Sequence, residues 1–171
     1  MPSVVFKGEP VNLAGTELSA GDTAPEFHLQ NNALEEVSLK SKPGRVRVLA
    51  VVPSLDTSVC SLESKRFNDE AAGMSEVDFY SISMDLPFAN KRWCGAEEAE
   101  HLVTLSAHRS EEFGQNYGCL ISGGPLDRIL TRAVFVVGKD DVLKHVEYCP
   151  EIAEHPNYDA ALDAAKAAVA E

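Results

Sequence analysis

The sequence predicts a single α/β domain built on a mixed sheet. Strand-like and helix-like segments alternate through the middle of the chain, and two successive strands and a helix end it. The strand at 45–52 is a near-continuous apolar run, which is typical of a strand covered on both faces. With 171 residues the chain is long enough for one core and too short for two. We expect one domain, 1–171, in which residues 1–15 form an N-terminal hairpin from extended pieces at 4–6 and 11–13.

A helix is expected directly after the 45–52 strand. Pro53 ends the strand, and Asp56 and Thr57 offer side-chain oxygens that can cap a helix N-terminus. The helix should end before Ser75, and its apolar side chains fall near one stripe. The residues of this stripe are Val59, Leu62, Phe67, Ala71 and Met74. The result is a strand, a turn and a helix in succession.

Shorter elements fill the second half of the chain. Residues 77–84 predict a second strand, and Asp85 and Pro87 predict a cap and the first turn of a second helix. This helix should stop at about Cys94, because Gly95 suits a helix terminus. The other expected elements are a strand at 103–105, a short helix from 110, strands at 132–137 and 142–149 around a turn, and a helix at 158–170 capped by Asn157.

Charge and hydropathy exclude several classes of function. The formal net charge of −12 repels nucleic acid and anionic lipid, so we expect neither as a partner. The densest basic stretch, 40–47, surrounds a Pro-Gly turn and is expected to be solvated. No apolar run approaches the roughly 20 residues that span a bilayer. The N-terminus has no features of a secretory signal, so we expect a cytoplasmic protein.

Motifs for nucleotide, hydrolase and metal chemistry are missing from the sequence. It has no G-x-G-x-x-G, G-x-x-x-x-G-K-[ST], G-x-S-x-G or H-E-x-x-H. Its four cysteines form no C-x-x-C, and its five histidines have no ligand-like spacing. We therefore expect neither a metal nor a cofactor. A Cys-His nucleophile pair stays open, although no spacing indicates one.

Cys60 stands out because of its place at the expected helix start. In the first turn, free backbone N–H groups and the positive end of the helix dipole favour a thiolate. Thr57 can turn its hydroxyl toward the sulfur, and Pro53 would cover the turn without adding a donor. A cysteine at this place can also be a small buried hydrophobe. Reactivity at Cys60 is therefore a hypothesis with a stated alternative.

The segment Pro53-Ser54-Leu55-Asp56-Thr57-Ser58-Val59-Cys60 resembles the peroxidatic-cysteine motif of the peroxiredoxins, in the form found in bacterial thiol peroxidases. Segments 83–89, 92–95 and 132–136 resemble the same family, in the same order. The resemblance covers nearly the whole chain. It implies a thioredoxin-like fold, with a mixed central sheet flanked by helices and decorated by the hairpin.

The same resemblance implies an atypical two-cysteine mechanism. Cys60 would be the peroxidatic residue and Cys94 the resolving residue, with Pro53, Thr57 and Arg132 completing the active site. The enzyme would reduce hydrogen peroxide and organic hydroperoxides through a Cys60 sulfenic acid and a Cys60–Cys94 disulfide. We expect local unwinding at both cysteines before this disulfide forms, because its Cα atoms must come within about 7 Å. By the resemblance, thioredoxin would reduce the disulfide, and the protein would be a homodimer without a cofactor.

Two features depart from the family pattern. Cys119 and Cys149 are extra cysteines, which we expect to be inert packing residues, and Trp93 stands where phenylalanine is more common.

A different class of function stays open, namely a peroxide-sensing thioredoxin-fold binding module without sustained turnover. A static structural disulfide is disfavoured in a reducing cytoplasm.

Overall fold

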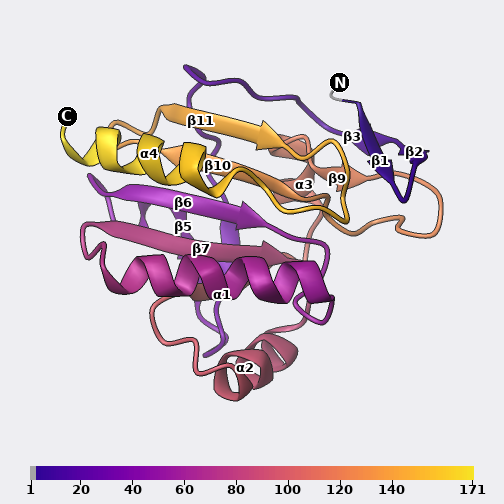
Figure 1. Cartoon of the computed structure of the whole chain (residues 1–171), viewed down its shortest axis with the longest axis horizontal. Helices are drawn as coiled ribbons and strands as arrows, with labels where there is room; N and C mark the ends of the chain where they lie inside the picture. The colour runs from indigo at the N-terminus through magenta and orange to yellow at the C-terminus, as the bar shows by residue number, and fades with distance from the viewer. Residues whose placement is uncertain (1–2) are drawn as a thin grey trace.

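Seven strands form the central sheet of the computed structural model, which describes residues 3–171 (Figure 1). Their order is β11-β10-β6-β7-β8-β4-β5. The strands are β4 (His28–Gln30), β5 (Glu36–Ser38), β6 (Val46–Val51), β7 (Val77–Ser83), β8 (Val103–Ser106), β10 (Ala133–Val137) and β11 (Leu143–Tyr148). β6, β7 and β8 are parallel, and the other neighbouring pairs are antiparallel. The mixed sheet expected from the sequence is confirmed. Residues 1 and 2 of the expected N-terminal hairpin region lie outside the described residues.

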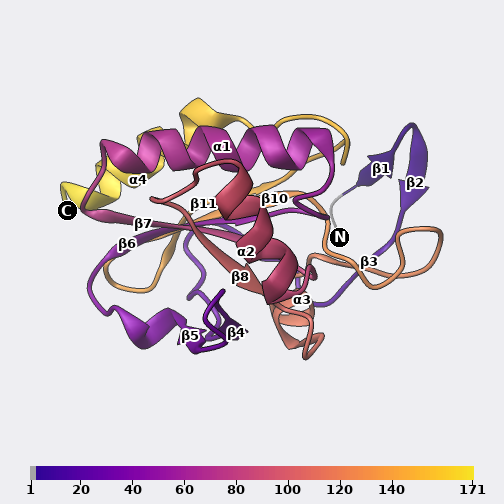
Figure 2. The same ribbon diagram turned by 90° about the horizontal axis from the view of Figure 1, so that it is seen from below.

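The helices are arranged in layers around this sheet. α1 (Ser58–Ala72) and α4 (Tyr158–Val169) lie together on one face, as Figures 1 and 2 show. α2 (Pro87–Ala96) connects β7 to β8 and packs against β8. The short α3 (Glu112–Asn116) and a single 3-10 turn, η1 (Leu39–Ser41), lie on the opposite face (Figure 2). The parallel strands are therefore joined by two helical crossovers, β6–α1–β7 and β7–α2–β8.

The central strands are buried on both faces. In β6, Leu49 and Val51 belong to one hydrophobic core, whereas Val48 and Ala50 belong to the core under α1 and α4. This alternation follows from the two-residue period of a strand. All six residues of β6 are buried, which explains why the segment is apolar except at Arg47.

The N-terminal hairpin stands beside the main sheet and is held by the C-terminal part of the chain. Lys7 and Gly8 form its turn, and both have a positive φ. The Glu151 carboxylate accepts hydrogen bonds from both of these N–H groups, and Ile152 donates its N–H to the Val5 carbonyl. The strands are β1 (Val4–Phe6) and β2 (Glu9–Val11), followed by β3 (Leu13–Ala14), which pairs with β9 (Leu120–Ile121).

The ends of α2 differ from the prediction. Gly95 lies inside the helix rather than at its end, because the Glu97 N–H donates to the Trp93 carbonyl at 2.9 Å and completes another turn. Leu86, not Asp85, is the N-cap residue. The carboxylate of Asp85 has other partners, described with the site.

The buried face of α1 is more polar than the predicted apolar stripe. Leu62 is 56% exposed, whereas Glu63, Ser64 and Asn68 are buried beside Phe67. Ser64 bonds a serine of β7, and Asn68 accepts two backbone N–H groups that precede β8. Because each polar side chain has a partner inside, burial is tolerated and hydropathy alone does not show the orientation of the helix.

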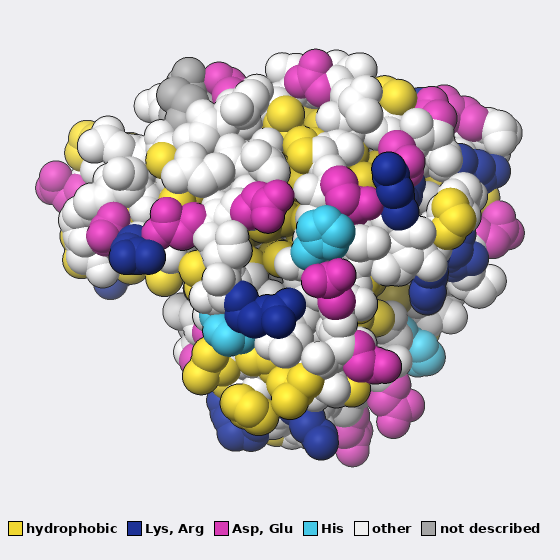
Figure 3. All heavy atoms as spheres, turned by 180° about the vertical axis from the view of Figure 1, so that it is seen from behind, with side chains coloured by type: hydrophobic (Ala, Val, Ile, Leu, Met, Phe, Trp, Pro, Cys, Tyr) yellow, Lys and Arg dark blue, Asp and Glu magenta, His cyan; other side chains and the backbone are white. Residues whose placement is uncertain are grey.

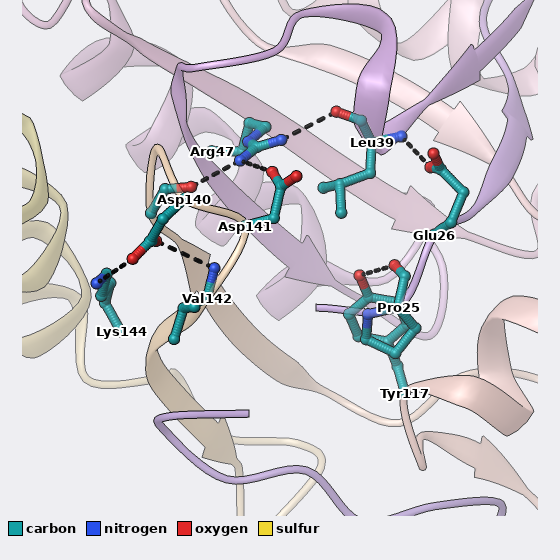
Figure 4. A network of polar contacts seen from close by, with 10 residues as sticks. Pro25, Glu26, Leu39, Arg47, Tyr117, Asp140, Asp141, Val142 and Lys144 are labelled. Atoms are coloured by element: carbon teal, nitrogen blue, oxygen red, sulfur yellow. Dashed lines mark hydrogen bonds and ion pairs between the residues drawn. The ribbon is translucent and has the colours of Figure 1, made fainter. Parts of the chain in front are cut away.

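The basic stretch at 40–47 is not uniformly solvated, contrary to the prediction. Arg47 is 1% exposed. Its guanidinium donates to the carbonyls of Leu39 and Gly138, at 2.9 and 2.7 Å, and to the carboxylate of Asp141 at 2.6 Å (Figure 4). The carboxylate neutralises the charge and the two carbonyls accept from Nη1 and Nη2, so the arginine can lie in the interior although its Nε has no partner among residues 3–171.

The molecular surface mixes acidic and basic side chains. On the face shown in Figure 3, lysines and arginines are scattered among acidic side chains and do not gather into one patch. Among residues 3–171, no helix combines the length and apolarity that a membrane span requires.

Candidate functional site

Cys60 lies in the first turn of α1, where the sequence predicts it. Thr57 is the N-cap residue, and its carbonyl accepts the first helical hydrogen bond from Ser61 at 2.9 Å. The Cys60 side chain is fully buried and packs in the core beneath α1 and α4. Its sulfur therefore lies at the positive end of a 15-residue helix and away from bulk water.

Arg132 brings a fixed positive charge to this sulfur. It immediately precedes β10 and is 2% exposed. Its Nη2 donates to Cys60 Sγ at 3.1 Å, its Nη1 donates to Glu63 Oε2 at 2.5 Å, and its Nε donates to the Ile152 carbonyl at 2.8 Å. The polar partner of the thiol is thus an arginine rather than a histidine. Three different groups fix the plane of the guanidinium.

Glu63 is a site residue that the sequence reasoning missed. Burial disfavours its charged form and raises its pKa to about 7, although Arg132 opposes the shift. Burial also works against the charge of Arg132, but Glu63 and Cys60 outweigh it and raise the pKa of Arg132 above its ordinary value. The Arg132 guanidinium therefore hydrogen-bonds two acidic groups, the Glu63 carboxyl and the Cys60 thiol. The signal in the sequence was spacing, because Glu63 follows Cys60 by three residues and lies on the same face of the helix.

A cavity of about 320 Å³ lies beside this cluster. It brings together Pro53, Thr57 and Arg132, three of the residues predicted for the site. The rest of its lining is largely apolar and comes from the hairpin, the start of α1 and two loops. These residues are Phe6, Lys7, Ser54, Ser58, Val59, Leu126, Ile129, Ile152 and Ala153. The site thus combines a buried sulfur, a cation and a small apolar cavity.

Neither of the predicted capping side chains caps α1. Thr57 donates its hydroxyl to the Ser54 carbonyl at 2.9 Å, and its oxygen keeps free acceptor capacity beside the cavity. Asp56 instead forms an ion pair with Arg92 of α2 at 2.6 Å. The loop before Cys60 is closed on itself and tied to α2 by these contacts.

Asp85 is a second missed residue of the site, and it supports this loop from the segment that follows β7. Its carboxylate accepts hydrogen bonds from Ser54 Oγ and from the Leu55 N–H, both at 2.8 Å, and from Ser83 Oγ at 3.0 Å. Three donors on one carboxylate fix its orientation. The sequence pattern predicts a helix cap here because Asp85 precedes Leu86 and Pro87. The carboxylate instead binds Ser54 and Leu55, in the loop before α1.

Cys94 lies apart from the Cys60 cavity, on α2. It is partly exposed, and its sulfur lies 3.4 Å from Thr104 Oγ1 and 3.6 Å from Asn32 Nδ2. Neither cysteine lines the cavity itself, but Cys60 reaches it through Arg132, whereas the two residues that contact the Cys94 sulfur do not line it. All four cysteines are free thiols in this structure. The structure therefore brings Pro53, Thr57, Cys60 and Arg132 together and leaves Cys94 at a separate place.

The two extra cysteines lie in the interior. Cys119 and Cys149 are 0% and 2% exposed, and burial raises the pKa of both thiols well above the ordinary value. This environment suits packing residues rather than nucleophiles.

Comparison with known proteins gives consistent matches over almost the whole chain. The Redoxin family model matches residues 19–162. The chain is 49% identical to a thiol peroxidase of Leptospira interrogans, covering 99% of this chain and all of that protein, and 45% identical to one of Bacillus subtilis, covering 99% of each. A peroxiredoxin-like protein from Aquifex aeolicus has a similar structure, with a TM-score of 0.92, 42% identity and 96% coverage of each chain. A thiol peroxidase from Chromobacterium violaceum shares the fold, with a TM-score of 0.86, 20% identity and 96% coverage of each chain.

Proposed function

Because the chain belongs to the Redoxin family, as a peroxidase of the thiol peroxidase group, we propose that Cys60 is the residue that attacks the hydroperoxide. The observation that carries this proposal is the contact of 3.1 Å between Arg132 Nη2 and Cys60 Sγ at a helix N-terminus. A fixed cation and a helix dipole both favour the thiolate, which is the nucleophilic form of cysteine.

The reaction follows from the groups around the sulfur. The Cys60 thiolate attacks one peroxide oxygen, so the S–O bond forms and the O–O bond breaks. The departing hydroxide or alkoxide takes up a proton and leaves as water or alcohol, and Cys60 becomes a sulfenic acid. Arg132 and the Thr57 hydroxyl hold the peroxide oxygens, and Pro53 shields the turn without offering a competing N–H group.

The cavity supports a substrate range that includes organic hydroperoxides as well as hydrogen peroxide. Phe6, Leu126, Ile129 and Ile152 give it apolar walls, which suit the hydrocarbon part of an organic hydroperoxide. Hydrogen peroxide needs only the polar end, formed by Thr57 and Arg132.

Cys94 completes the catalytic cycle in this proposal. Its attack on the Cys60 sulfenic acid gives a Cys60–Cys94 disulfide, which thioredoxin reduces in the cytoplasm. A disulfide needs Cα atoms within about 7 Å, so both helix segments unwind locally before it forms. We further propose that the chain acts as one domain and assembles as a homodimer.

A peroxide-consumption assay coupled to thioredoxin tests the proposal. Cys60→Ser should abolish consumption, because no other residue supplies the nucleophile. Cys94→Ser should oxidise once and then fail to recycle. Cys119→Ala is the matched control, because it removes a buried cysteine outside the site and should cycle like the parent.

Two results would count against this function. Peroxide consumption by Cys60→Ser would remove Cys60 from the mechanism. A parent protein that reacts once and never turns over with thioredoxin would instead fit the peroxide-sensing alternative.

A further inference from the structure

Cys94 is held by a closed ring of hydrogen bonds with Asn32 and Thr104. Asn32, in the turn between β4 and β5, donates from Nδ2 to the sulfur at 3.6 Å. Thr104, on β8, donates its hydroxyl to Asn32 Oδ1 at 2.8 Å, and its Oγ1 lies 3.4 Å from the sulfur. Because the single hydroxyl proton of Thr104 is directed at Asn32, the third bond runs from the Cys94 S–H to Thr104 Oγ1. Each of the three groups donates once and accepts once.

This ring ties the Cys94 sulfur to Asn32 and to β8 rather than to the segment that carries Cys60. The sulfur borders its own surface hollow, and none of the residues that line this hollow lines the cavity beside Arg132. The lining residues are Asn31, Asn32, Ala33, Cys94, Ala99, Leu102, Val103 and Thr104. Thr104 is 2% exposed, so one side of the ring belongs to the fixed interior. Cys94 must leave the ring before it can attack another sulfur.

The two residues before Cys94 are anchored on the opposite side, to the segment that carries Cys60. Arg92 pairs with Asp56 at 2.6 Å, and Trp93 Nε1 donates to Ser61 Oγ at 3.0 Å. Asp56 and Ser61 flank Cys60 in the chain, so unwinding of the first turn of α1 moves both partners away. The ring is then one of the contacts that still hold this part of α2, together with the Lys65–Glu97 ion pair at 3.2 Å and the packing of Trp93 in the core.

We propose that Asn32 and Thr104 are positioning residues that latch Cys94 in the reduced, folded state and thereby set the rate of disulfide formation. The inference rests on the proposed function, in which Cys94 is the resolving residue. Once the ring opens, Cys94 Sγ attacks the Cys60 sulfur, the S–S bond forms and the S–O bond breaks. The hydroxyl group leaves with the Cys94 proton as water. Reduction of the disulfide by a dithiol restores the thiol, and the ring closes again.

Near-isosteric variants test the latch. Thr104→Val and Asn32→Leu each remove ring bonds while preserving side-chain shape, and Thr104→Ser keeps the hydroxyl. After a pulse of hydrogen peroxide, disulfide formation in the first two variants should be about 2- to 10-fold faster than in the parent, which is the effect of losing one of the two hydrogen bonds that the Cys94 sulfur makes in the ring. Thr104→Ser should return to the parent rate. Trp93, the one tryptophan in the sequence, reports the step by stopped-flow fluorescence, and mass spectrometry of quenched samples identifies the disulfide.

A second measurement separates the latch from general destabilisation. In thiol–disulfide buffers, the same two variants should favour the disulfide by about 2- to 10-fold relative to the parent, because their reduced state has lost the ring. Tyr148→Phe is the control, since its hydroxyl bonds the Tyr117 carbonyl and the Leu18 N–H rather than α2. It should lower the free energy of unfolding and leave both the rate and the buffer equilibrium unchanged.

The outcomes distinguish the two proposals. Unchanged or slower disulfide formation in both Thr104→Val and Asn32→Leu would overturn the latch. Absence of a Cys60–Cys94 disulfide in the oxidised parent would overturn the resolving role of Cys94 itself.

Discussion

Two buried arginines lie at opposite ends of the ladder formed by β6 and β10. Arg47 lies in β6 opposite the last residue of β10, and Arg132 immediately precedes the first. Arg47 bonds two backbone carbonyls and Asp141, whose side chain is 37% exposed. Arg132 bonds one carbonyl, a fully buried carboxylate and a thiol. Burial is nearly the same at the two ends, but the partners are not.

The partners separate a structural arginine from a reactive one. Backbone carbonyls cannot gain or lose a proton, so most of the surroundings of Arg47 are fixed once the chain folds. Both side chains bonded to Arg132 can exchange a proton, and they share one positive charge. The environment at this end therefore responds to pH and to oxidation of the sulfur.

Replacing Arg132, the reactive arginine, should have the largest effect, which is on the rate of Cys60 oxidation. Arg132→Lys keeps the charge but loses the planar fork that reaches sulfur, carboxylate and carbonyl together. We expect the rate constant for Cys60 oxidation, measured by single-turnover stopped flow, to fall by about 100- to 1000-fold. A rate near that of the parent would mean that charge alone is sufficient.

The structural arginine should give the reverse pattern. Arg47→Met removes one buried cation and leaves two carbonyls and Asp141 without their donor. The free energy of unfolding, measured in urea, should fall by about 2 to 3 kcal/mol. The rate constant for Cys60 oxidation in the folded protein should match the parent. An equal loss of rate would show that the two ends of the ladder are coupled.

The last expected effect is the pH dependence of stability that Glu63 carries. In the folded protein Glu63 keeps its proton up to a pKa of about 7, whereas the ordinary value is 4.5. The folded state therefore binds more protons than the unfolded state between these values, and stability falls as pH rises through this window. Relative to Glu63→Gln, the parent should lose about 3 kcal/mol of unfolding free energy there, since each pKa unit corresponds to about 1.4 kcal/mol. Urea unfolding at several pH values measures the difference, which should be constant below pH 4.5. If the stability difference between the parent and Glu63→Gln did not change with pH, the raised pKa of Glu63 would be contradicted.

Local sequence pattern was sufficient for the elements with strong signals. β6, β7 and β10 were predicted to within one residue at their ends, because each is a buried strand rich in apolar and β-branched residues and is bounded by turn-forming residues. β4 and β5 were missed because each has three residues, which is too short to establish a period. Asn157 was recognised as a cap, and its side chain accepts the N–H of Ala160.

The site was predictable only where a residue could be recognised from its neighbours in the chain. Pro53, Thr57 and Cys60 share one motif, and the structure places them around one cavity and its adjoining core. Glu63 and Asp85 were not predicted, because their partners are distant in sequence and hydropathy assigns charged residues to the surface. The ring around Cys94 was out of reach for the same reason, since it joins three separate segments.

The hairpin contact with Ile152 has a practical consequence for producing the protein. The Ile152 N–H donates to the Val5 carbonyl, and the Ile152 carbonyl accepts from Arg132 Nε. Phe6 of the same hairpin forms part of the cavity wall. Removing the first dozen residues, or fusing a bulky purification tag to them, would therefore loosen the hydrogen bond that positions the Arg132 guanidinium against the Cys60 sulfur. The carboxyl end lies at the other extremity of the molecule (Figure 1), and an affinity handle belongs there.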